Sequence, residues 1–386
     1  MLDSPLSRPP TPDPRPLLFL LLLLAACSGS HAGAERAVKA EMRPASGGVR
    51  VQTAGTFQPP LTVVWKSKLY APLLAPPVVE NGMVYLPMPD HRIYTVDLRT
   101  GVQAAFSKVG GVAQAAPVLK AGVLFLALSG RADRDQTGLL AVDLQRNRTR
   151  WQRPLPVGWS SPVLVDDTLY IGAEDNALYA LDTETGDTRW RFLTKAPVRS
   201  SPAVAYGLVF VGSDDDHLYA LDAEVGTLRW SFRTGGSIPA APVVADSAVY
   251  VGSYDRTLSC LDAATGRLRW RWTTDGSLYG SPVVKEGRVF IGSNDRTLSC
   301  VDAATGTLRW RYATNGVIRG TPLLVGSVLY VGSSDKRLYA LDTASGRLLW
   351  QYETGGSITV SPVVVDGLLL VGSEDRYVYA FTGAAQ

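Results

Sequence analysis

Tryptophan recurs at a fixed interval through most of this chain. The interval is 40 residues between the five tryptophans Trp190, Trp230, Trp270, Trp310 and Trp350. Trp151 lies 39 residues before the first of them, and Phe106 and Trp65 continue the series backwards with looser spacing. A fixed period of this size is typical of repeat folds, in which each repeat is one supersecondary unit that packs on its neighbours. The 386 residues therefore predict one repeat domain, although length alone would suggest two or three domains.

Each repeat contains four short runs of β-branched and aromatic residues, separated by turn residues. Residues 328–333 and 338–342 are two such runs. Runs of this length at this spacing predict antiparallel strands joined by hairpins. Turns such as Asp262 to Gly266 fit, because the carboxylate can accept bonds from nearby backbone N–H groups and glycine accepts positive φ. A four-stranded unit of about 40 residues predicts a β-propeller blade. The Gly-His and Trp-Asp pairs of WD40 blades are absent from the required positions.

The number of blades follows from a proline that opens the first strand of each repeat. It occurs eight times: Pro77, Pro117, Pro162, Pro202, Pro242, Pro282, Pro322 and Pro362. The last repeat stops at Phe381 without its tryptophan strand, whereas the tryptophan strand at residues 63–65 has no repeat before it. We predict an all-β, eight-bladed propeller of four-stranded antiparallel blades, closed by pairing of the N- and C-terminal strands. It should cover residues 60–382 and leave a tail at 383–386.

The N-terminus predicts export. A short apolar run, Leu17–Leu24, follows two arginines and is too short to span a hydrocarbon core as a helix. Small residues follow it, as at a signal-peptide cleavage site. The sequence Leu24-Ala25-Ala26-Cys27 resembles the bacterial lipobox, and this resemblance implies that Cys27 is lipidated. We expect a signal peptide over 1–26 and a lipidated cysteine with a flexible tether, poor in apolar residues, over 27–59.

Composition argues against several function classes. The net charge of +3 is spread without basic blocks, so no nucleic-acid surface is expected. Three histidines assemble neither a catalytic triad nor a zinc site, and we predict no catalytic and no metal-binding residues. Residues 214–217 (Asp-Asp-Asp-His) are interpreted as a solvated turn. Cys260 and Cys300 occupy equivalent positions in neighbouring repeats and are predicted to be buried, reduced thiols.

Two segments are candidates for partner binding. The positions three residues before each strand-opening proline should ring the axial mouth: Gln114, Trp159, Arg199, Pro239, Tyr279, Arg319 and Thr359. This ring has no carboxylate and should repel Ca²⁺. Its aromatic and arginine members, Trp159, Arg199, Tyr279 and Arg319, predict a binding surface for a partner or ligand. An insertion between Leu128 and Leu139 forms a candidate partner loop on the same face, with Arg131, Asp133, Arg134 and Asp135; a merely solvated loop is the alternative.

The repeat also resembles a known family. Residues 261–270 (LDAATGRLRW) are similar to the tryptophan-docking motif of the pyrroloquinoline-quinone (PQQ) repeat, and the resemblance covers about residues 60–382. Quinoprotein dehydrogenases use such propellers to hold PQQ and calcium, but they are much longer and commonly carry an adjacent cysteine pair, which this chain lacks.

A compact propeller with a lipobox is more similar to the BamB family, the lipoprotein scaffold of outer-membrane β-barrel assembly. That resemblance implies a non-enzymatic monomer without a cofactor. Its protein partner would lie in the envelope, with the β-barrel assembly subunit as a candidate, and its only membrane contact would be the lipid. Ser28 fits the periplasmic face of the outer membrane better than the inner membrane, where Asp is the usual signal. The alternatives are a ligand-binding or sensor lipoprotein of the PQQ-repeat family and, less favoured, a PQQ-dependent dehydrogenase.

Overall fold

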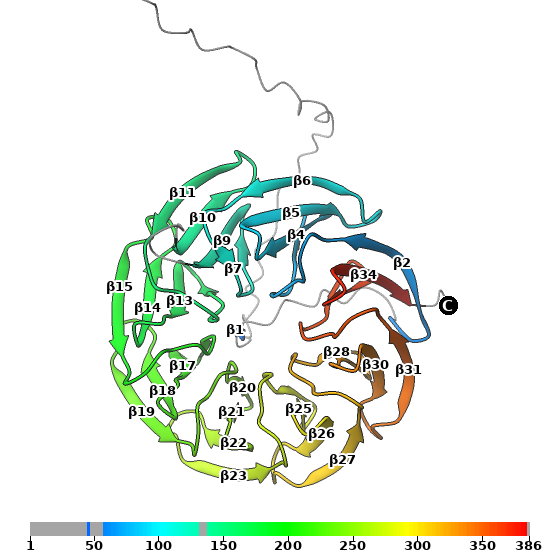
Figure 1. Cartoon of the computed structure of the whole chain (residues 1–386). Helices are drawn as coiled ribbons and strands as arrows, with labels where there is room; N and C mark the ends of the chain where they lie inside the picture. Colours follow the sequence, from blue (N-terminus) through cyan, green and yellow to red (C-terminus); the bar gives the residue numbers. More distant parts are fainter. Residues whose placement is uncertain (1–44, 47–56, 131–136, 384–386) are drawn as a thin grey trace, which may run out of the picture. The chain divides into compact units, whose positions relative to one another are not determined.

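A computed structural model describes residues 45–46, 57–130 and 137–383 of the chain (Figure 1). All regular structure in these residues is β-strand, arranged in eight sheets around an axis. The predicted all-β propeller of eight antiparallel blades is confirmed. Several predicted features lie outside the described residues: the signal peptide, Cys27 and the loop residues Arg131, Asp133, Arg134 and Asp135.

Each blade runs from an inner strand at the axis to an outer strand at the rim. The first four blades are β3–β6 (Val78–Glu80, Met83–Met88, Arg92–Asp97, Gln103–Lys108), β7–β11 (Val112–Ala113, Val118–Lys120, Val123–Ser129, Gly138–Asp143, Arg148–Arg153), β12–β15 (Val163–Val165, Thr168–Gly172, Ala177–Asp182, Thr188–Leu193) and β16–β19 (Ala203–Ala205, Leu208–Gly212, His217–Asp222, Leu228–Arg233). In blade two, β7 and β8 both pair with β9.

The other four blades close the ring. They are β20–β23 (Val243–Ala245, Ala248–Gly252, Thr257–Asp262, Leu268–Thr273), β24–β27 (Val283–Lys285, Arg288–Gly292, Thr297–Asp302, Leu308–Ala313), β28–β31 (Leu323–Val325, Val328–Gly332, Arg337–Asp342, Leu348–Glu353) and β32–β34 with β2 (Val363–Val365, Leu368–Ser373, Tyr377–Gly383, Leu61–Lys68). A short strand β1 (Ala45–Ser46) adds to the inner edge of blade four.

The sequence pattern of each strand follows from its place in the blade. The second strands β13, β21 and β29 are buried at every residue, because neighbouring blades cover both faces of each sheet. They therefore read as continuous apolar runs. Outer strands such as β27 alternate between exposed and half-buried residues, because their outward side chains meet solvent. Eight apolar clusters form the core.

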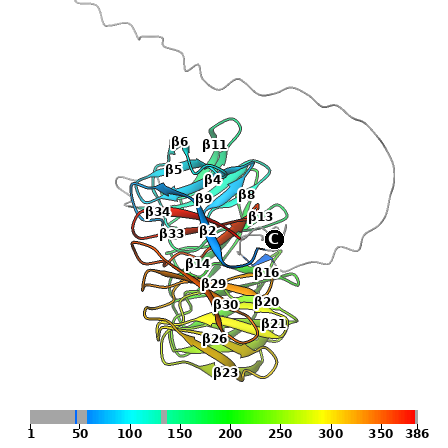
Figure 2. The same ribbon diagram turned by 90° about the vertical axis from the view of Figure 1, so that its right-hand side faces the viewer.

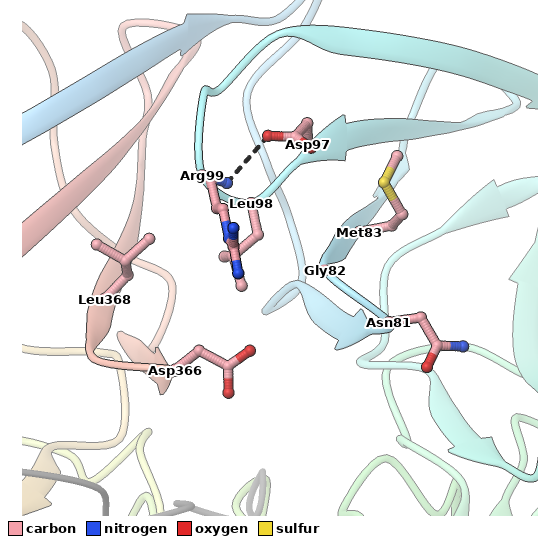
Figure 3. A pocket seen from close by; sticks show the side chains of 8 residues that line it. All are labelled: Asn81, Gly82, Met83, Asp97, Leu98, Arg99, Asp366 and Leu368. Atoms are coloured by element: carbon pink, nitrogen blue, oxygen red, sulfur yellow. Dashed lines mark hydrogen bonds between the residues drawn. The ribbon is translucent and has the colours of Figure 1, made fainter. Parts of the chain in front are cut away.

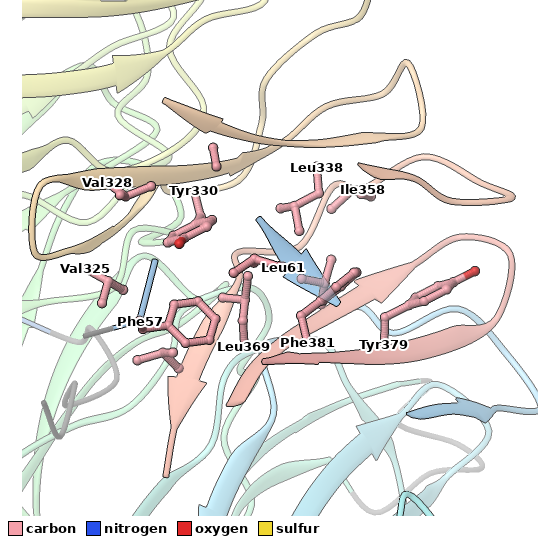
Figure 4. Close-up of a cluster of buried hydrophobic side chains, with 13 residues drawn as sticks. Phe57, Leu61, Val325, Val328, Tyr330, Leu338, Ile358, Leu369, Tyr379 and Phe381 are labelled. Atoms are coloured by element: carbon pink, nitrogen blue, oxygen red, sulfur yellow. The ribbon is translucent and has the colours of Figure 1, made fainter. Parts of the chain in front are cut away.

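The ring closes as predicted, with β2 pairing antiparallel to β34 and Trp65 opposite Ala380. Figure 2 shows β2 beside β34, although the two strands come from opposite ends of the domain. Phe57 lies before the predicted start of the propeller, yet it is buried with Leu61 and Tyr330 in the cluster between blades seven and eight (Figure 4). The packed part of the chain thus includes Phe57.

A tryptophan links most pairs of neighbouring blades. Trp230 at the rim of blade four donates its indole N–H to the carbonyl of Ala263 in blade five, over 3.0 Å. Its ring lies against Gly266 in the same turn, where an added Cβ would come within 2.6 Å of the ring. The same indole-to-carbonyl bond is made by Trp65, Trp151, Trp190, Trp270 and Trp310. These contacts explain the 40-residue tryptophan spacing.

Candidate interaction surface

Two sets of segments share one face of the propeller. Each inner strand begins at this face, and the turn between the second and third strands returns to it, because successive strands are antiparallel. We call it the mouth face; it carries the residues before each inner strand, such as 158–161 and 198–201, and turns such as 173–176. The opposite face carries the other turns, such as 182–187, and is called the turn face.

Hydrogen bonds that run from blade to blade hold the segments at the mouth. Ser160 Oγ donates to the carbonyl of Ser200 over 3.0 Å, and Ser200 Oγ donates to the carbonyl of Ala240 over 2.9 Å. The backbone N–H of Thr321 donates to Ser361 Oγ in the same way. These residues lie one or two positions after the predicted ring residues, so hydrogen bonds between blades hold the backbone beside the ring.

The structure places the four predicted mouth residues on this face. Trp159 and Tyr279 are 55% and 41% exposed, values that are high for such large side chains, and Arg199 and Arg319 are also exposed. They lie in the segments before β12, β16, β24 and β28, respectively. The structure thus brings them to one face, where Arg199 belongs to one cluster of side chains and Tyr279 and Arg319 belong to another.

Carboxylates surround Arg199. Its Nη2 is 2.9 Å from Glu174 Oε2 and its Nη1 is 2.8 Å from Asp214 Oδ2. The predicted ring positions themselves carry no carboxylate, but the turns after the second strands bring Glu174 and Asp214 beside them, and Glu374 accepts a bond from Thr359. The bond to Glu174 raises the pKa of Arg199. Burial raises the pKa of Asp214, although Arg199 acts in the opposite direction. The charge of Arg199 is thus balanced within the protein.

An aromatic and cationic cluster adjoins this ion-pair cluster. The rings of Tyr254 and Tyr279 lie 4.7 Å apart, and the guanidinium of Arg319 lies 5.5 Å from the Tyr279 ring. Burial, and then the bond with Tyr279, raises the pKa of Tyr254. Tyr254 also interacts electrostatically with Arg199 and Asp214, so it joins the two clusters. Together with the exposed Trp159, which follows Gly158 beside Glu174, they form one polar and aromatic surface, called the mouth cluster: Trp159, Glu174, Arg199, Asp214, Tyr254, Tyr279 and Arg319.

Three members of the mouth cluster were missed in the sequence: Glu174, Asp214 and Tyr254. They occupy one repeat position, the residue before the Asp of the turn that follows the second strand. Reading that position across all repeats would have found them. Gly158 shows how close the two positions come, because a Cβ there would lie 2.4 Å from Glu174 Oε1.

The Asp-Asp-Asp-His segment is a turn, as predicted. Asp215 Oδ1 accepts the backbone N–H of His217, its Oδ2 accepts the Tyr219 hydroxyl, and Asp214 pairs with Arg199. In the described part of the chain, no group of three or more His, Cys, Asp and Glu residues is placed to hold a metal.

Cys260 and Cys300 are free and buried, which confirms the prediction of reduced thiols. Burial raises the pKa of each thiol to about 11. Both side chains are therefore protonated, unreactive members of the core at neutral pH.

The turn face has a hollow of about 560 Å³ between blades one and eight (Figure 3). Asp97, Arg99 and Asp366 are its charged lining residues, and Met83 and Leu368 are apolar ones. The backbone N–H of Arg99 donates to Asp97 Oδ1 over 3.1 Å. The hollow is thus separate from the mouth cluster.

The described residues on either side of the candidate partner loop lie at the mouth face of blade two. These flanking residues, Ser129 and Gly138, end β9 and begin β10, at the position of the turn after the second strand in other blades. Ser129 Oγ donates to the carbonyl of Val112.

No helix in the described ranges is long and apolar enough to cross a membrane.

Comparison with known families decides the relationship. Four overlapping segments, residues 61–156, 135–242, 233–320 and 298–385, match the family described as outer membrane protein assembly factor BamB. The chain belongs to this family. Its BamB-type repeats therefore cover the whole propeller.

Solved structures agree at the level of the fold. BamB from Moraxella catarrhalis superposes with a TM-score of 0.71 at 19% identity, covering 83% of this chain and 99% of that one. The computationally designed Ika8 protein gives 0.71 at 15% identity, with 83% and 99% covered. A europium-containing methanol dehydrogenase gives 0.70 at 11% identity, with 83% and 93% covered. The BamB-type propeller thus also occurs in a designed protein and in an enzyme.

A curated relative matches part of this chain. The serine/threonine-protein kinase AfsK of Streptomyces griseus is 35% identical over 135 residues, which are 32% of this chain and 16% of that protein. The match spans less than a fifth of the kinase, so the similarity concerns only a part of each protein.

Proposed function

We propose that this protein is a non-enzymatic envelope scaffold that docks a protein partner on its mouth face during outer-membrane protein assembly. The observation that carries this proposal is the mouth cluster, in a chain of the BamB family. Trp, Tyr and Arg dominate binding hot spots. Here Trp159, Tyr279 and Arg319 are exposed on a base held by bonds between blades, so their positions are fixed before a partner binds.

The electrostatics of the mouth cluster favour a polar partner surface with an apolar anchor. Arg199 is already paired with two carboxylates, so it orients its neighbours and carries little unbalanced charge. Trp159 and the Tyr279–Arg319 pair offer large contact areas whose burial would stabilise a complex.

We further propose that Cys27 carries the lipid anchor and that the protein works at the periplasmic face of the outer membrane. The lipobox and the family relationship support this placement. Cys27→Ser should move the protein from the membrane fraction to the soluble envelope fraction. Wild-type protein found in the soluble fraction would contradict the anchor.

Capture of partners from mild detergent tests the scaffold. Trp159→Ser combined with Arg319→Glu should reduce recovery of a β-barrel assembly subunit at least tenfold, as loss of one hot spot does. Arg267→Glu with Arg347→Glu is the matched control, because both arginines are exposed on the turn face. The melting temperature of both variants should stay near that of the native protein.

The same preparation tests the enzyme alternative. The shared fold with a methanol dehydrogenase makes a bound quinone worth measuring. Recovery of a quinone with alcohol turnover, and no assembly subunit, would reject the scaffold proposal. Equal capture of the subunit by the mouth-face and turn-face variants would show that the partner binds another surface.

A further inference from the structure

One turn position carries an exposed base in four consecutive blades. The position is the last residue of the turn between the second and third strands, on the mouth face. In blades five to eight it is occupied by exposed residues that we call the basic arc: Arg256, Arg296, Lys336 and Arg376. Figure 1 shows the strands of these blades in succession around one half of the ring, from β20 to β34.

The side chains of the basic arc make no ion pair or hydrogen bond with any residue in the described part of the chain. The aspartate before each base bonds elsewhere: Asp255 Oδ1 accepts the backbone N–H of Thr257, and its Oδ2 accepts that of Gly235 in the preceding blade. The equivalent aspartates of blades six to eight do the same and are half-buried. Glu374 is the exposed carboxylate of these four turns. The exposed charges of the turns are therefore mainly cationic.

The backbone conformation of this position does not favour a long base. The φ angle is +71° at Arg256 and lies between +69° and +73° at the other three residues of the basic arc. In this left-handed region, long side chains are uncommon, and Asn, Asp and glycine are preferred. Blades three and four follow that preference with Asn176 and Asp216. The turn thus forms without a base, and a strained residue kept in four blades indicates a role outside the fold.

The two halves of the mouth face differ in charge. Blades three and four present Glu174, Asp214 and Asp216 there, with Arg199 paired to the first two. Blades five to eight present the basic arc, which begins two residues after Tyr254 of the mouth cluster. A partner that contacts the mouth cluster therefore reaches the arc as well. Complementary charge on that partner would fix which way round it binds.

We propose that the basic arc binds an acidic segment of the protein partner. This inference rests on the proposed scaffold function and adds the chemistry of the partner, a segment rich in Asp and Glu that follows blades five to eight. Unpaired guanidinium groups can bind carboxylates through two parallel hydrogen bonds. Because the bases are exposed, each contact contributes little alone, and the arc acts through the number of its charges.

Replacing the arc by the residue of blade three tests the proposal: Arg256→Asn, Arg296→Asn, Lys336→Asn and Arg376→Asn in one chain. The probe is a fluorescent glutamate-rich peptide of about 20 residues, long enough to cross several blades when extended, and anisotropy measures its Kd at low salt. The variant should bind it roughly tenfold more weakly. Its melting temperature should not fall, because Asn accepts the positive φ better than Arg or Lys does.

A turn-face variant that removes the same charge is the control: Arg99→Asn, Arg267→Asn, Lys285→Asn and Arg347→Asn, all at exposed positions. It should bind the peptide nearly as tightly as the native protein. Equal weakening in both variants would show an effect of net charge alone and would overturn the proposal. A melting temperature lowered by several degrees in the arc variant would do the same, because it would give the bases a structural role.

Vesicles containing phosphatidylglycerol separate a lipid surface from an acidic protein segment. Loss of vesicle binding in the arc variant, with unchanged peptide binding, would reject the protein segment. Capture of the assembly subunit is measured separately. Normal capture by the arc variant, with capture lost in the Trp159 and Arg319 variant, would reject this inference and leave the proposed function standing. Peptide binding by the arc without capture of any subunit would support the arc and reject the proposed function.

Discussion

The junctions between blades three to seven and the junction between blades seven and eight use different interactions for the same task. In the first group a tryptophan donates a hydrogen bond to the next blade and lies on a glycine, as Trp230 does on Gly266. Blade eight has no matching turn, because its outer strand is β2 from the other end of the domain. Trp350 instead packs edge-on against Phe381, with ring centroids 5.7 Å apart.

The closing junction shows a second difference. Tyr170 and Tyr250 each donate a hydroxyl hydrogen bond to a carbonyl of the following blade. Tyr330 is their equivalent, yet its buried hydroxyl has no partner, and the ring of Phe57 packs edge-on against it at 5.7 Å. Directional bonds thus hold the regular junctions, whereas apolar burial of a segment from the N-terminal side holds the closing one. The comparison predicts which changes each junction tolerates.

Removal of β2 should have the largest effect. Truncation before Ser67 deletes three buried apolar side chains, Phe57, Leu61 and Trp65, each contributing about 1.5–3 kcal/mol. We expect a loss on the order of 5 kcal/mol or more, with aggregation through the exposed edge of β34. Val63→Thr with Val64→Thr is the control, because both side chains face outward. Identical denaturant midpoints for truncated and intact protein would refute closure by burial.

Replacing the glycine under a docked tryptophan should cause the second-largest loss of stability. Gly266→Ala places Cβ 2.6 Å from the Trp230 ring at a φ of +70°, so backbone strain adds to displacement of the ring, about 2–4 kcal/mol together. Gly207→Ala has a φ of +71° but no atom within 4 Å, and should cost only about 1–2 kcal/mol of strain. Chemical denaturation of the two variants measures the difference. Equal losses would mean that the tryptophan contact adds nothing.

Replacing the indole should separate the two kinds of junction. Trp230→Phe removes the hydrogen bond to Ala263 and should cost about 1 kcal/mol more than Trp350→Phe, whose indole donates to no described residue. Both changes remove similar apolar area, so the difference in unfolding free energy isolates the directional bond. A larger loss at Trp350 would reverse the comparison.

Lowering the pH should weakly destabilise the blades that contain Asp143, Asp182, Asp262 and Asp302. The bond from Arg269 and those from Thr265 lower the pKa of Asp262 to about 2, and arginine and backbone bonds do the same for Asp143, Asp182 and Asp302. A carboxyl with a depressed pKa stabilises the fold above its unfolded value near 4, and this stabilisation is lost as the pH falls from about 4 to about 2. Asp262→Asn should flatten the fall in melting temperature over that window. An unchanged slope would show that the pair adds no stability.

The repeat predicted the fold because each blade repeats the same physical problem. Most junctions use a tryptophan at the rim and every repeat has an opening proline before its inner strand, so blade number and closure by Trp65 could be predicted directly from the sequence. Phe57 could not, because it lies outside the repeat and acts only where the repeat is interrupted. Glu174 and Asp214 were missed because the mouth residues were predicted from one position per repeat, the residue three before each proline. The turn between the second and third strands brings a second position of each repeat to the same face.

The pairing of β2 with β34 also sets an order in time. β2 ends at Lys68 and β34 begins at Tyr377, so 308 residues lie between the end of β2 and the start of its partner strand. At about 5–20 residues per second, synthesis alone separates them by roughly 15–60 s. Trp65 and the apolar side of β2 must remain unpaired throughout that interval. The ring can therefore close only after the seven residues of β34 have been synthesised.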